Sequence, residues 1–121
     1  MASSSHRTLA TLSHDFLRAK CAFHPHTATW LGFHAYDGQV PDLSQSALET
    51  RSADLRRFLE ALDRIDPADL DDQDWLDHQV LRHQAAFEAF VIEDWQKWAR
   101  DPFYYLEPLD VSNYLLRSYA P

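Results

Sequence analysis

Residues 44–65 read SQSALETRSADLRRFLEALDRI, and this stretch decides the fold class. Its large apolar residues recur at steps of seven, three, four and three: Leu48, Leu55, Phe58, Leu62 and Ile65. This spacing places them on one side of an α-helix, as a seam that can pack on another helix. Ser44 precedes the periodic run and suits an N-cap, whereas Asp66-Pro67 ends it. We therefore predict a helix from about Gln45 to Ile65.

The next stretch along the chain predicts the longest helix, from about Gln73 to Ala99, capped by Asp71 or Asp72 and closed by Asp101-Pro102. Six residues are expected to follow one broad apolar face: Leu76, Val80, Phe87, Val91, Trp95 and Trp98. At ~1.5 Å per residue this helix would be roughly 40 Å long. The other helices of the chain could not easily cover such a length.

Towards the N-terminus, a helix is expected from Thr8 to Phe23, since apolar residues recur there at three and four: Leu9, Leu12, Phe16, Ala19 and Phe23. A short helix can follow from Pro25 to Gly32, where glycine suits a left-handed cap. The segment 33–43 is expected as an ordered loop, with a turn at Asp37-Gly38. A last helical run is expected from about Leu109 to Tyr119. The fold prediction is thus an all-α antiparallel bundle of about four to five helices joined by Pro-marked turns.

Composition narrows the class of protein. The 121 residues allow one core, and 45% hydrophobic residues are enough to fill it, so 1–121 is expected as a single helical region. The formal net charge of −8 disfavours nucleic acid and anionic membranes as partners. No apolar run is long enough for a signal peptide or a membrane span, which makes the cytoplasm the default location. The single cysteine, Cys21, is expected to be packed rather than reactive.

The seven histidines raise the question of a metal site. His78 and His83 are five residues apart, about 140° around a helix, and cannot readily share an ion. Asp74 and His78 share a face, which favours a solvated ion pair. A weaker alternative is a metal site formed by three histidines near a turn: His24, His26 and His34. We therefore assign no metal ligand.

No complete catalytic motif is present: the sequence lacks a Gly-rich phosphate loop, a nucleophile elbow and His-Glu-x-x-His. We therefore assign no catalytic residue. The weak candidates for substrate binding are three loop residues, His34, Tyr36 and Asp37, although a turn and local packing would also explain them. An aromatic group could form an interface or part of the core: Trp95, Trp98, Phe103, Tyr104 and Tyr105.

Three short motifs together resemble one family. They are His24-Pro25 through Ala28-Thr29-x-Leu31-Gly32-x-His34-x-Tyr36-Asp37, then Val40-Pro41-Asp42-Leu43-Ser44, and Tyr114-Leu115-Leu116-Arg117 through Tyr119-Ala120-Pro121. In order and spacing they are similar to the N-terminal third of the bacterial family called domain of unknown function eight-eight-five (DUF885).

This resemblance implies a long, mostly helical protein related to the zincin metallopeptidases, with a His-Glu-x-x-x-x-His-like zinc helix far downstream. Zinc is implied for that parent protein, and no ligand or catalytic residue carries over to this chain. The first hypothesis is therefore a non-catalytic, structural or substrate-enclosing N-terminal region of a zinc-peptidase-like hydrolase acting on peptides. Its partner would be the downstream helices, or a second copy through self-association. The rival hypothesis is a free-standing helical module that binds a protein.

Overall fold

The computed structural model describes residues 4–110 and 112–116. It contains α-helices α1 (Ser4–Phe23), α2 (Pro25–Trp30), α3 (Gln45–Asp63), α4 (Asp72–Glu93), α5 (Lys97–Arg100) and α6 (Ser112–Leu116). Four short 3-10 turns join them: η1 (His34–Tyr36), η2 (Pro67–Asp69), η3 (Pro102–Tyr105) and η4 (Glu107–Leu109). These residues include no strand, so the predicted all-α fold is confirmed. Tyr119, in the last predicted helix, lies outside the described residues.

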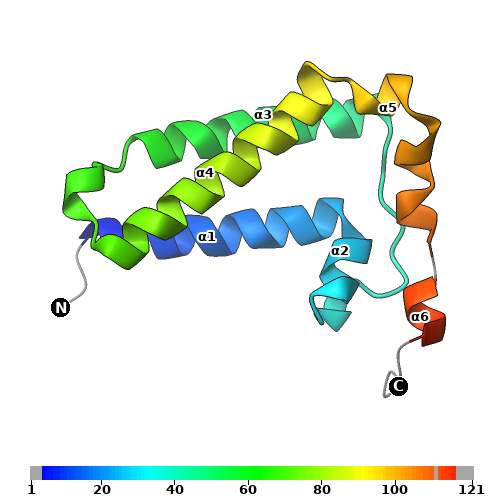
Figure 1. Cartoon of the computed structure of the whole chain (residues 1–121), viewed down its shortest axis with the longest axis horizontal. Coiled ribbons are helices and arrows are strands. Elements are labelled where there is room, and N and C mark those ends of the chain that lie inside the picture. Colours follow the sequence, from blue (N-terminus) through cyan, green and yellow to red (C-terminus); the bar gives the residue numbers. More distant parts are fainter. Residues whose placement is uncertain (1–3, 111, 117–121) are drawn as a thin grey trace.

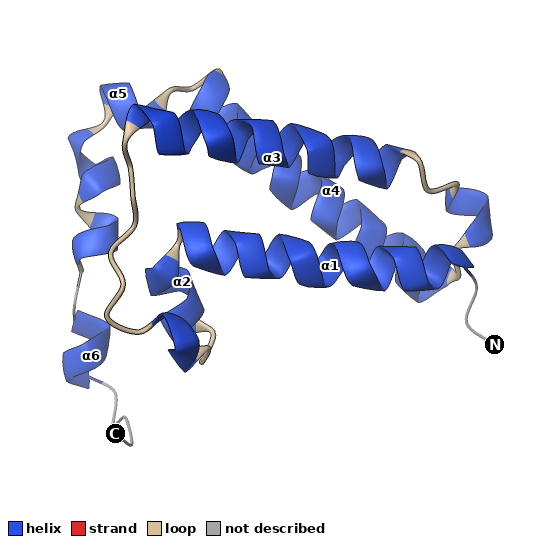
Figure 2. Cartoon of the chain, turned by 180° about the vertical axis from the view of Figure 1, so that it is seen from behind, coloured by secondary structure: helices blue, strands red, loops and turns tan. Residues whose placement is uncertain are grey.

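The three long helices form an antiparallel bundle (Figure 1). α3 and α4 make a hairpin closed by η2 and pack most extensively on each other, while α1 contacts both. The short elements α2, α5, η3, η4 and α6 gather at the end of the bundle where α1 finishes, as both views show (Figures 1 and 2). Among the residues that the structure describes, no helix combines the length and apolar character needed to cross a bilayer.

Apolar stripes of the three long helices supply the core. One buried cluster consists of Phe16, Leu48, Leu55, Ala85, Ala89 and Ile92, and a second of Leu9, Leu62 and Ile65. The rings of Phe16 and Phe58 stack with centroids 4.7 Å apart, which ties α1 to α3. The stripe predicted for α3 is therefore confirmed. In α1 the stripe holds except that Ala19 is exposed, and Cys21 is buried as expected.

The predicted helix starts rest on side-chain caps. The Ser44 hydroxyl accepts a hydrogen bond from the Ala47 N–H at 3.3 Å, and the Asp71 carboxylate accepts one from the Asp74 N–H at 2.8 Å. The choice between Asp71 and Asp72 is thereby settled for Asp71. After α2, Gly32 adopts φ +84°, the left-handed conformation expected of it.

The predicted continuation of the longest helix to Ala99 is wrong. α4 ends at Glu93: the Asp94 N–H makes the last regular helical bond, to the Phe90 carbonyl, and the Trp95 N–H turns back to the same carbonyl. Gln96 then takes the left-handed conformation, φ +50°, before α5 begins. The indole N–H of Trp98 donates to the Ile92 carbonyl at 2.9 Å. Trp98 therefore packs back against the bundle after a turn. This position explains why its spacing in the sequence was consistent with a continuous helix.

The apolar face predicted for α4 lies largely on the outer side of the bundle, in agreement with the expectation that the other helices could not cover it. Leu76, Val80 and Phe87 are 50%, 52% and 54% exposed. The buried side of α4 is instead made of Asp74, His78, Ala85, Glu88, Ala89 and Ile92. Small residues allow α4 to approach α1 and α3 closely, and the buried polar side chains have partners there. The large apolar residues consequently lie on the outer side.

Candidate functional site

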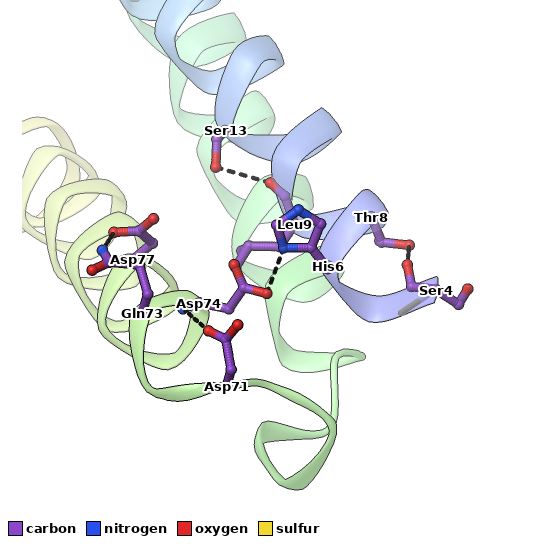
Figure 3. A network of polar contacts seen from close by, with 9 residues as sticks. All are labelled: Ser4, His6, Thr8, Leu9, Ser13, Asp71, Gln73, Asp74 and Asp77. Carbon is purple, nitrogen blue, oxygen red and sulfur yellow. Dashed lines mark hydrogen bonds and ion pairs between the residues drawn. The ribbon is translucent and has the colours of Figure 1, made fainter. Parts of the chain in front are cut away.

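Polar side chains join α1 to α4 at both ends of α1. At the first end, His6 Nδ1 lies 2.7 Å from the buried carboxylate of Asp74 (Figure 3). The Ser5 hydroxyl also donates to Asp69, in η2, at 3.4 Å. Asp71 caps the same turn (Figure 3). Since these contacts close the start of α4 over the start of α1, we interpret them as structural.

The solvated ion pair predicted between Asp74 and His78 does not form. Both side chains are buried, and they turn to different partners. Asp74 contacts His6, whereas His78 Nε2 donates to the Leu62 carbonyl of α3 at 3.0 Å. Asp74 and His78 do share the buried face of α4, as expected, but each binds a different neighbouring helix instead of the other.

At the other end of α1 lies a buried ion pair. The Arg51 guanidinium donates to both oxygens of Glu88, with Nε–Oε1 2.7 Å and Nη2–Oε2 3.1 Å. Arg51 is 4% exposed and Glu88 9%. Burial alone would raise the pKa of Glu88, but hydrogen bonds from His24 and Arg51 and the charge of Arg51 outweigh it and lower the pKa to about 2. Glu88 is therefore a carboxylate at neutral pH.

Two further groups reach the same carboxylate. His24 Nε2 lies 3.3 Å from Oε1 of Glu88, and the Lys20 ammonium lies 3.6 Å from Oε2. The Arg51 guanidinium also lies 5.7 Å from the ring centre of Phe23. The buried negative charge of Glu88 thus faces two permanent positive charges, those of Lys20 and Arg51.

A pocket of about 250 Å³ opens beside this ion pair. Its polar side is lined by Lys20, His24, His26, Thr27, Gln84, Glu88, Tyr104 and Glu107. Its apolar side is lined by Phe23, Leu43, Phe87, Val91, Ile92 and Pro108. A largely apolar hollow with a few convergent polar groups is the usual form of a small-molecule site. We call this feature the α1–α4 pocket and take it as the candidate functional site.

His26 and Tyr104 are the lining residues whose environments are most unusual. His26 Nδ1 is buried and has no hydrogen-bond partner, which is costly unless a ligand or water completes it. Burial, and next the neighbouring His24, lower the pKa of His26. Burial likewise raises the pKa of Tyr104, helped by Tyr105 and Glu88. At neutral pH both side chains are therefore uncharged.

The predicted substrate-binding residues lie elsewhere. His34 Nδ1 is 2.8 Å from one oxygen of Asp37, and the Thr29 hydroxyl donates to the other oxygen at 2.8 Å. These two hydrogen bonds, from His34 first, lower the pKa of Asp37. Tyr36 lines a separate hollow of about 180 Å³ with Cys21. None of the three predicted residues lines the α1–α4 pocket, and their role in binding stays a prediction.

The histidine trio is only partly brought together. His24 and His26 have ring centres 5.7 Å apart and both line the α1–α4 pocket, whereas His34 does not. Across residues 4–110 and 112–116, no three His, Cys, Asp or Glu side chains are grouped to hold a metal ion. The zinc implied by the family resemblance therefore has no set of ligands among them.

Sequence reasoning missed the central residues of the site. Arg51 follows Leu48 by three positions and precedes Leu55 by four, which puts it on the buried face of α3. Glu88 is spaced in the same way between Ala85 and Ile92 on α4. Two opposite charges that both fall on packed faces could have indicated a buried pair, but only knowledge of the helix register would have matched them.

A family model described as "Bacterial protein of unknown function (DUF885)" matches residues 25–116, from α2 to α6. The match covers more than half of the chain and agrees with the resemblance found in the sequence motifs. No curated protein and no solved structure shows significant similarity to the chain.

Proposed function

Because this chain belongs to the DUF885 family, we propose that it is the N-terminal region of a zinc-metallopeptidase-like hydrolase. In that protein it would enclose a peptide substrate without catalysing the reaction itself. The peptidase part of this proposal comes from the family resemblance of the sequence. The enclosing part is supported by the outer side of α4.

The outer side of α4 carries the proposal. Its residues Leu76, Val80, His83, Phe87 and Phe90 follow one another at steps of four, three, four and three. This is the spacing with which one helix packs against another, and the seam contains no Asp, Glu, Lys or Arg. The four apolar members are about half exposed. We call these five residues the outer seam and propose that a further helical region covers it.

The outer seam and the α1–α4 pocket share Phe87. A helical region that packs on the seam would thus stand beside the mouth of the pocket, and the two regions together would form an enclosed space. Enclosure strengthens polar interactions with a substrate, since it removes competing water. This neighbourhood supports a substrate-enclosing role more than a purely structural one.

The rival function, a free-standing interaction module, would use the same seam to bind a protein or a second copy. One aromatic residue buries only ~150 to 250 Å². Five residues that are already half-covered therefore supply less than the ~800 Å² that each partner buries in a stable complex. A covering region would have to contact neighbouring surface as well, which favours a large helical partner over a short peptide.

The proposal can be tested by reconstitution. The chain would be purified and mixed with a separately produced family region that carries the zinc motif, and peptide hydrolysis and co-elution would be measured. We expect the chain alone to be inactive and the mixture to co-elute as an active complex. Val80→Lys, in the outer seam, should abolish co-elution, whereas Glu60→Lys, exposed on α3, should not.

Failure to co-elute with wild-type chain, or an unaffected Val80→Lys complex, would overturn the proposal. If the chain instead formed a defined dimer by light scattering, and Val80→Lys dissociated it, the interaction module would be the better account. Both variants replace exposed residues, so their folding can be verified by circular dichroism before the comparison.

A further inference from the structure

We infer that the α1–α4 pocket binds a small carboxylate that carries an apolar group, either a free acid or the C-terminal residue of a peptide. The inference concerns this chain alone and does not depend on a peptidase parent. It rests on three properties of the pocket: the donors on its polar side, the saturation of its one buried carboxylate, and the size of its apolar side.

The donors on the polar side favour an anion. The Lys20 ammonium has three N–H donors, and its contact with Glu88 is long at 3.6 Å. His26, which lines the same pocket, has a buried Nδ1 without a hydrogen-bond partner. Lys20 is the permanent positive charge among the lining residues, whose acids are the buried Glu88, already paired with Arg51, and the exposed Glu107. A ligand carboxylate would pair with Lys20 and satisfy the unused donors.

The buried carboxylate of the pocket, Glu88, has no free oxygen with which to bind a cationic ligand. Oε1 of Glu88 accepts from Arg51 Nε and contacts His24, while Oε2 accepts from Arg51 Nη2 and faces Lys20. Both oxygens are thus occupied by groups of this chain. The other acid that lines the pocket, Glu107, is exposed, where water weakens its attraction.

The apolar side limits the size of the ligand. Sites for drug-sized molecules usually enclose ~300 to 1,000 Å³, and this pocket of about 250 Å³ is smaller. Its walls are aliphatic and aromatic, from Phe23, Leu43 and Val91 among others. It fits one side chain of the size of leucine or phenylalanine together with its carboxylate.

The test compares 3-phenylpropanoate with 3-phenylpropanamide, which has the same shape without the charge, and with 3-phenylpropylamine, a cation that carries the same phenyl group. Their affinities for the purified chain would be measured by calorimetry and ligand-detected NMR at pH 7. We expect the acid to bind roughly tenfold or more tightly than either the amide or the amine, because only it pairs with Lys20. Equal affinity of acid and amide in the wild-type chain would overturn the inference, and this result needs no variant.

A matched pair of variants identifies the donor. Lys20→Met should weaken binding of the acid roughly tenfold and leave the amide unchanged. Lys97→Met is the control, since Lys97 is similarly exposed (29% against 25% for the Lys20 side chain) and forms an ion pair away from the pocket. Thermal melts would verify that both variants fold. An unaltered acid affinity in folded Lys20→Met would contradict the inference.

The source of the carboxylate follows from one further comparison, between N-acetyl-alanyl-phenylalanine and its C-terminal amide. Tight binding of the acid form alone would identify a peptide C-terminus as the ligand. Binding of 3-phenylpropanoate without binding of the dipeptide would identify a small free acid. If none of the four carboxylate and amide ligands binds at millimolar concentration, the inference is wrong.

Discussion

The two sides of α4 differ in a way that reverses the usual rule. The side packed in the bundle carries Asp74, His78 and Glu88 beside two alanines, Ala85 and Ala89. The solvent side carries the large apolar residues of the outer seam. In an amphipathic helix of a single bundle the two sets would be exchanged.

The difference shows that fit and pairing, rather than polarity alone, decide which side of this helix is buried. The alanines allow close approach of neighbouring backbones, which large side chains would prevent. Each polar residue of the inner side meets a partner: His6 for Asp74, Leu62 for His78 and Arg51 for Glu88. The large apolar residues of the outer side are then left about half exposed.

The strongest test of the inner side is Glu88→Leu. It leaves the Arg51 guanidinium buried without its counter-charge, and breaking a buried pair from one side costs ~3 to 5 kcal/mol of unfolding free energy. Urea denaturation monitored by circular dichroism would measure the loss. The double variant Arg51→Met with Glu88→Leu should recover most of it, because neither charge then remains. A single variant as stable as wild type would show that burial here does not depend on pairing.

Acid titration tests the same pair without mutation. The folded-state pKa of Glu88, about 2, lies below its ordinary 4.5. As the pH falls, the unfolded chain therefore takes up this proton first, and stability present above about pH 4.5 is lost as the pH falls through about 2. The shift corresponds to about 3 kcal/mol. The Arg51→Met, Glu88→Leu double variant should lack this component of the acid transition.

His26 contributes to the same titration at higher pH. Its folded-state pKa is lowered from 6.5, so the unfolded chain binds the proton more readily, and stability declines as the pH falls below 6.5. His26→Phe should remove this earlier decline while leaving the Glu88 component in place. A wild-type stability that is constant from pH 7 to pH 5 would contradict the prediction.

Ala85→Leu tests the fit of the inner side. Ala85 is fully buried between the long helices, and the added methyl groups should cost ~1 to 3 kcal/mol of unfolding free energy. Ala86→Leu, one position further on the exposed side, is the matched control and should change stability little. Equal effects of the two substitutions would mean that the inner side is loosely packed.

The smallest effect is expected on the outer side. Val80→Lys should change the unfolding free energy of the isolated chain by less than ~0.5 kcal/mol, because the side chain is half exposed. The same variant should reduce non-specific self-association of the isolated chain in light scattering, as distinct from the defined dimer of the rival function, since it places a charge in the outer seam. A large loss of stability would mean that the seam is covered within the chain itself.

The sequence was sufficient to predict the elements that depend on local rules. The stripe of α3, the caps Ser44 and Asp71 and the left-handed Gly32 follow from periodicity and from backbone chemistry. The end of α4 could not be predicted, because Gln96 is not a residue that marks a left-handed break. The exposure of the apolar face of α4 agrees with the expected lack of cover, but the polar residues of its buried side were not predicted, because apolar periodicity does not identify what packs on the opposite face.

The candidate site was harder to predict than the fold. His24 and His26 were considered for their side-chain chemistry, but Lys20, Arg51 and Glu88 were not, since they lie on three stretches that only the packed bundle brings together. His34 and Asp37 were predicted as loop residues that a local turn would also explain. Their hydrogen bond accordingly closes a local turn.

The attachment of α1 to α4 at its two ends also has a consequence for how the chain folds. His6 and Asp74 are 68 residues apart, and His24 and Glu88 are 64 apart, so each contact must close a long loop of chain. The α3–α4 hairpin closes a far shorter one, and its loop-closure entropy is correspondingly smaller. We expect α3 and α4 to gain amide protection before α1 during refolding, in pulse-labelling hydrogen exchange, and simultaneous protection would contradict this order. The α1–α4 pocket would then be among the last features to form, so that ligand binding would report completion of the whole bundle.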